Sequence, residues 1–175
     1  MGDLLTLIAE LSVGIAGFTA VFSVLDRGGV RDPAEAPLQL FRVKQMLLGG
    51  VTTALACVLA LALMASSLSE PVVWRIAGGA GAAAILTLFV TLQAEAKRER
   101  LSEAPGYSHA HASVIYGLAA TGLVFLGLTV IAAAQPIAPT LYSGGMVAMF
   151  ALSAIQFARA AIKQFAASMA RAGRE

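Results

Sequence analysis

The residue with the greatest capacity for chemistry in this sequence is Glu10, an acid inside an otherwise apolar run. A charge at the centre of a membrane helix costs roughly 2.5–3.5 kcal/mol on insertion scales, and less toward the interface, so acids inside a membrane usually serve a function. In a helix, Thr6 lies one turn before Glu10, and Asp3 lies a further turn out. The same face continues in the other direction through a narrow apolar stripe that comprises Val13, Gly14, Gly17 and Val21.

The sequence leaves three interpretations of Glu10 open. If the first helix lines the axis of a homo-oligomer, Glu10 forms an acidic ring that attracts cations, and the apolar stripe below it gates by dewetting. If each subunit works alone, Glu10 is a protonatable carrier site. In the third interpretation, a protonated Glu10 is hydrogen-bonded to a neighbouring helix and serves packing alone.

Other reactive residue types do not form a recognisable site. His109 and His111 bracket one residue, but the sequence supplies no further ligands at a metal-binding spacing. The glycine-rich run 78–81 lies inside an apolar segment, not between a strand and a helix, so it predicts no phosphate loop. The sequence contains neither a G-x-S-x-G elbow nor an H-E-x-x-H motif. We therefore expect no metal site, no cofactor and no enzymatic activity.

The composition indicates that membrane helices position these residues. Of the 175 residues, 58% are hydrophobic and 13% are charged, against roughly 45–50% and about 25% in soluble domains. The mean hydropathy is +0.80. These values exclude a soluble enzyme domain and a disordered chain. A disulfide scaffold is excluded as well, because Cys57 is the only cysteine.

Five stretches reach the roughly 20 apolar residues that a helix needs to cross the hydrocarbon core. They cover residues 4–25, 46–68, 72–94, 112–134 and 137–158. The runs do not alternate apolar and polar residues, as the strands of a β-barrel would. The predicted fold is an all-α integral membrane protein, with a bundle of five transmembrane helices in a single membrane domain of residues 1–175.

The basic residues predict the orientation of this bundle, since cytoplasmic connections carry an excess of Lys and Arg. Loop two contains only Arg75. The other eleven fall in loop one, loop three and the C-terminal end, which five spans place on one side: Arg27, Arg31, Arg42, Lys44, Lys97, Arg98, Arg100, Arg159, Lys163, Arg171 and Arg174. We expect a cytoplasmic C-terminus and an outside N-terminus. The high content of Ala, Gly and Arg suits a bacterial inner membrane.

Three helices are expected to continue past the bilayer into the cytoplasm. Residues 38–45 follow Pro37, which is a helix-start signal. Residues 95–100 are strong helix formers, and residues 159–172 carry apolar side chains at a spacing of three or four. At the opposite end, Trp74 and Tyr142 are expected near the outer interface, where amphipathic rings favour the headgroup level.

Small residues are dense in all five predicted spans. Ser12, Ala16 and Ala20 are spaced four apart in the first span, and every span contains glycine. Helices in lipid associate through close backbone approach at such residues. The interior of one five-helix bundle is too limited to use all of them, so we predict a homo-oligomer in the lipid bilayer, or association with another membrane protein. The net charge of +2 reflects the orientation signal and predicts no nucleic-acid partner.

The run from Ala9 to Val21, AELSVGIAGFTAV, resembles the first span of a group of small, uncharacterised bacterial multi-span membrane proteins. That resemblance covers about the first third of the chain and implies no activity. A fainter similarity to the Orai calcium-channel subunits rests on residues 16–21, and on residues 52–55 and 61–64 of the second span. It implies an oligomer whose first helix lines a pore with an acidic ring. The chain departs from that family in having five spans instead of four, the opposite N-terminal side and an acid near the start of the helix.

The sequence thus favours a subunit of a homo-oligomeric membrane pore or cation channel, with Glu10 at the outer mouth. One alternative is a non-conducting scaffold or accessory subunit, which binds another membrane protein through its small-residue faces. The other is a proton- or cation-coupled carrier that uses Glu10.

The orientation leads to a direct prediction. A protease-sensitive tag fused after Glu175 is expected to be cut only when the cytoplasmic side is accessible, because the basic end is retained there. Digestion of spheroplasts and of inverted membrane vesicles measures this. Cleavage from the exterior alone would overturn the orientation.

Overall fold

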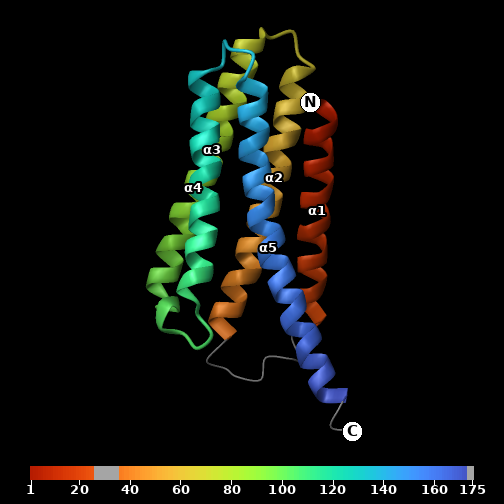
Figure 1. Cartoon of the computed structure of the whole chain (residues 1–175), viewed down its shortest axis with the longest axis vertical. Coiled ribbons are helices and arrows are strands. Elements are labelled where there is room, and N and C mark those ends of the chain that lie inside the picture. Colours follow the sequence, from red (N-terminus) through yellow and green to blue (C-terminus); the bar gives the residue numbers. More distant parts are fainter. Residues whose placement is uncertain (26–35, 173–175) are drawn as a thin grey trace.

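The computed structural model describes residues 1–25 and 36–172 of the chain (Figure 1). The described residues form helices and connections, with no strand among them. All five α-helices are long and apolar enough to cross a membrane, which confirms the predicted all-α fold with five candidate spans. Arg27, Arg31 and Arg174 lie outside the described residues, and so do the side chains of Lys163 and Arg171. The elements are α1 Gly2–Leu25, α2 Ala36–Met64, α3 Glu70–Arg98, the short 3₁₀-helix η2 Leu101–Glu103, α4 His109–Ile131 and α5 Ala138–Ala172.

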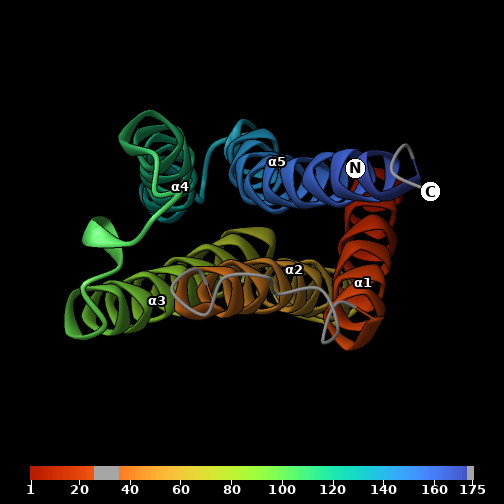
Figure 2. The ribbon, with the colours of Figure 1, turned by 90° about the horizontal axis from the view of Figure 1, so that it is seen from below.

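Successive helices run in opposite directions. We call the end that carries Met1 the upper end and the end that carries the C-terminus the lower end, as in Figure 1. Seen from below, α2 and α3 form one layer, α4 and α5 form a second layer, and α1 closes one side of the bundle (Figure 2). α1 packs mainly on α2 and also on α5, and α2 contacts α5 between the layers. The helices α2 and α5 are therefore the centre of the fold.

Local sequence signals account for the starts of three helices. α2 begins at Ala36 with Pro37 in its first turn, and α3 has Pro71 in its first turn, where the missing N–H costs no hydrogen bond. At the start of α4 the Ser108 hydroxyl accepts a hydrogen bond from the backbone N–H of His111. The segments expected to extend the second and fifth spans continue these helices, α5 as far as Ala172, whereas α3 ends at Arg98, two residues short of the predicted 95–100 segment.

Two helix ends fall short of the prediction. The second span was expected to reach residue 68, but α2 ends at Met64. The fourth span was expected to reach residue 134, but α4 ends at Ile131. The backbone N–H of Gln135 donates to the Ala132 carbonyl, and the N–H of Ala138 donates to the Gln135 carbonyl. These two tight turns reverse the chain within a few residues, so the alanines after Ile131 serve the connection and not the helix.

Glycine allows neighbouring helices to approach closely. A Cβ placed on Gly78 of α3 would lie 3.1 Å from the carbonyl oxygen of Leu126 on α4. A Cβ on Gly145 of α5 would lie 3.0 Å from the Leu126 side chain, and one on Gly50 of α2 would lie 3.0 Å from the Ser12 carbonyl of α1. Each of these contacts is closer than side chains at those positions would permit. Many of the glycines that the sequence singled out are thus used inside one chain.

The upper half of the bundle closes around Tyr142 of α5. Its ring is fully buried, and its hydroxyl donates a 2.7 Å hydrogen bond to the Ala56 carbonyl of α2. Trp74 of α3 packs against it with ring centroids 5.7 Å apart, and the indole N–H donates to Glu70. Both rings lie near the upper end, but they face the interior instead of the headgroups, because Ala56 and Ala60 of α2 leave room for them. The interfacial surroundings expected for these rings are therefore wrong.

Neighbouring glycines in α3 provide a matched test of this packing. Gly78→Ala is expected to lower the free energy of unfolding by about 1–3 kcal/mol, because its Cβ would push α3 away from the α4 backbone. Gly79→Ala meets nothing within 4 Å and is expected to be neutral, or stabilising by up to about 1 kcal/mol, through helix propensity. Unfolding of the purified variants in one detergent measures both. Equal effects at the two positions would show that glycine at residue 78 has no packing role.

Candidate pore-lining face of α1

α1 has one face that packs inside the chain. Leu5, Ser12 and Thr19 are buried on this face, and so are Ile8 and Ala16. Ser12 and Ala16 contact Gly50 of α2, so two of the three residues of the predicted small-residue stripe pack within the chain. Ala20, the third member of that stripe, is exposed.

The opposite face of α1 carries the residues for which the sequence predicts a role in a pore. We call these six residues the Glu10 face: Thr6, Glu10, Val13, Gly14, Gly17 and Val21. Gly14 is half-buried, and the other five are exposed. The fold thus places all six residues on the outside of the bundle, and no other described helix covers them.

Glu10 has no hydrogen-bond or ion-pair partner among residues 1–25 and 36–172. Thr6, one turn above, does not serve as a partner, because its hydroxyl donates to the Gly2 carbonyl at 3.0 Å. The interpretation in which Glu10 bonds to a neighbouring helix of its own chain therefore finds no contact in the described structure. A carboxyl in this position is satisfied only by water, by lipid headgroups or by another polypeptide.

The glycines of the Glu10 face differ from those of the core. A Cβ on Gly14 or Gly17 would meet nothing within 4 Å, so packing inside the chain does not require glycine at either residue. A bare backbone beside an unpartnered acid leaves a shallow strip into which a second helix can pack closely.

The remaining polar residues singled out in the sequence have local partners or lie elsewhere. The Thr53 hydroxyl donates to the Gly49 carbonyl of its own helix. His109 packs edge-on against Tyr107, with ring centroids 5.0 Å apart. No group of three His, Cys, Asp or Glu residues close enough to hold a metal ion occurs in the described part of the chain.

The sequence did not reveal a second feature, a cleft in the lower half of the bundle. Two hollows adjoin there between α2 and α4 and share Phe41, Gln45, Ile115 and Tyr116, and we call the two together the cleft. The sequence signal that could have indicated a cleft is the pair of glutamines, Gln45 and Gln93, near bulky aromatic residues. Sequence alone could not bring residues from four helices to one place.

Tyr107 lies at the lower edge of this cleft. Burial raises the pKa of its phenol above the ordinary value, and the neighbouring Tyr116 raises it further through its charge and a side-chain hydrogen bond. The Tyr107 hydroxyl therefore stays protonated at neutral pH.

Comparison of the chain with protein-family models, with curated proteins and with solved structures finds no match. The fold and the positions of these residues are therefore the basis for any functional assignment.

The Glu10 face gives a prediction about assembly. In a Cys57→Ala background, Gly17→Cys is expected to form covalent dimers in membranes treated with a short bifunctional thiol reagent, because residue 17 faces outward from each chain. Ala16→Cys is the matched control, since Ala16 is buried against α2. Dimers at both positions, or at neither, on a non-reducing gel would contradict the placement of this face between copies.

Proposed function

We propose that the chain is a subunit of a homo-oligomeric membrane pore for cations, with the Glu10 face lining the axis. The observation that carries this proposal is the exposure of Glu10 in an apolar helix, without a hydrogen-bond or ion-pair partner among the described residues. Facing acyl chains, such a carboxylate would cost up to roughly 2.5–3.5 kcal/mol. Around a water-filled axis, the same residue is hydrated and forms an acidic ring.

The position of α1 supports this arrangement. α1 lies at the side of the bundle and contacts only α2 and α5 extensively, so its outer face is free to meet further copies of the chain (Figure 2). Gly14 and Gly17 allow those copies to approach closely. Below Glu10 the stripe is apolar, with Val13 and Val21 both more than half exposed. A narrow apolar constriction of this kind closes a pore by expelling water.

A carrier that works as a single subunit is less well supported. Such a mechanism needs Glu10 to face a cavity inside its own chain. Neither of the two hollows described above includes a residue of α1, and both lie in the lower half of the bundle. We therefore retain the pore as the proposed function.

The proposed location is a bacterial inner membrane with the N-terminus outside. The up-and-down topology places six of the described basic residues at the lower end: Arg42, Lys44, Lys97, Arg98, Arg100 and Arg159. Arg75 lies at the upper end. This distribution supports a cytoplasmic lower end, which puts Glu10 in the outer half of the pore.

The pore is tested by conductance in planar bilayers. One unit charge acting at about 4 Å in water contributes about 1 kcal/mol, which is a factor of about five. Glu10→Gln is therefore expected to lower the ratio of cation to anion permeability by about fivefold or more. Glu103→Gln removes the same charge from an exposed residue at the lower end and is expected to leave the ratio unchanged.

Two results would overturn the proposal. Equal selectivity of the wild type and Glu10→Gln would show that the acid does not line the conduction path. A protein that is monomeric in mild detergent, or that carries no current after reconstitution, would fit the alternative of a non-conducting scaffold.

A further inference from the structure

The lower half of the bundle contains the cleft described above, which the proposed pore does not use. Its deeper part is apolar and is lined from three further directions by Ile85 and Leu88 of α3, Ala119 of α4 and Met149 of α5. Phe89 of α3 and Tyr116 of α4 form one wall, with an edge-to-face ring contact of 5.7 Å. This part of the cleft offers a site for hydrocarbon.

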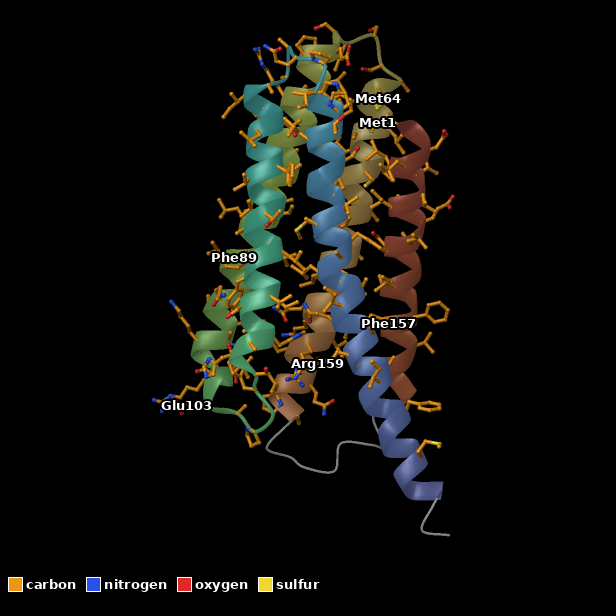
Figure 3. The ribbon with its side chains drawn as sticks, viewed as in Figure 1. Met1, Met64, Phe89, Glu103, Phe157 and Arg159 are labelled. Atoms are coloured by element: carbon orange, nitrogen blue, oxygen red, sulfur yellow. The ribbon has the colours of Figure 1, made fainter. Side chains whose placement is uncertain are left out.

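The lower mouth of the cleft is basic. Arg42 and His111 line it, and Figure 3 shows Arg159 of α5 below Phe89, at the same end of the bundle. Arg42 is held at the mouth by a 2.9 Å hydrogen bond to the Gly106 carbonyl. Arg159 forms no ion pair among the described residues.

On three helices, the residues at the basic mouth and those at the apolar part of the cleft are separated by similar intervals. Arg42 precedes Gly49 by seven residues on α2, His111 precedes Ala119 by eight on α4, and Leu152 precedes Arg159 by seven on α5. Each interval corresponds to about 10–12 Å along a helix. Figure 3 shows Phe89 well above Arg159. The cleft is therefore amphipathic along the direction in which the helices cross a bilayer.

We propose that this cleft holds one anionic phospholipid of the leaflet at the lower end. Its phosphate lies between Arg42, His111 and Arg159, and part of one acyl chain lies against Phe89 and Ala119. The charge of the mouth selects an anionic headgroup. The deeper, apolar part of the cleft favours a lipid over free phosphate. The Gln45 amide, which also lines the cleft, supplies a further hydrogen bond at the level of the glycerol and its esters.

The experiment is native mass spectrometry of the purified full-length protein titrated with phosphatidylglycerol. Arg159→Gln is expected to weaken binding about tenfold, the effect of losing one charge-assisted hydrogen bond. Arg98→Gln is the matched control, because Arg98 is an exposed cation at the same end that pairs with Glu99 outside the cleft. Ala119→Phe fills the apolar part, leaves every charge in place and is also expected to weaken binding.

The controls distinguish binding in the cleft from general attraction of lipid to the basic surface. Equal losses in Arg159→Gln and Arg98→Gln would indicate general surface attraction and overturn the proposal. So would phosphatidylcholine bound as tightly as phosphatidylglycerol, or inorganic phosphate bound as tightly as the lipid. If Arg159→Gln does not fold, unchanged binding in Ala119→Phe still overturns the site. These measurements involve no current, so their failure is distinct from failure of the pore.

Discussion

The constraint on which this structure depends is that five apolar helices must be held together by close contact, since lipid would provide no hydrophobic drive between them. The contacts are concentrated where the helices have small residues. Gly78, Gly145 and Gly50 bring backbones within reach of Leu126 and Ser12, and Tyr142 fills the remaining space and bonds to Ala56. Removing the bare backbone at one of these points separates two helices, and dispersion contacts fall steeply with separation.

The same constraint explains why the two halves of the bundle differ. The upper half has alanine and glycine where the layers meet, and it closes into one continuous core around Tyr142 and Trp74. In the lower half, Phe41, Phe89 and Tyr116 lie between the layers, and the buried cluster there is small. The Lys44–Glu95 ion pair still joins α2 to α3 at this level. A cleft therefore forms at the basic end, while the proposed acidic ring lies at the closed end.

α1 shows how one helix can serve both the chain and an assembly. Ser12 and Ala16 meet α2, and on the other side Gly14 and Gly17 lie next to the unpartnered Glu10. The two sets of small residues are interleaved in sequence and separated only by the helical period. A face that combines an acid with bare backbone is poorly suited to acyl chains, which is the physical basis for placing it between subunits.

The sequence by itself determined the number of helices, their approximate ends and the concentration of basic residues at one end, because length, apolar content and loop charge are local properties. It also placed Glu10 and Gly17 on one helical face, since the period of a helix is fixed. Only the tertiary structure decided which face of α1 is covered, that Trp74 and Tyr142 point inward, and that Arg42 and His111 line the mouth of an apolar cleft. Those facts depend on how each helix is rotated against its neighbours, and contacts between distant residues set that rotation.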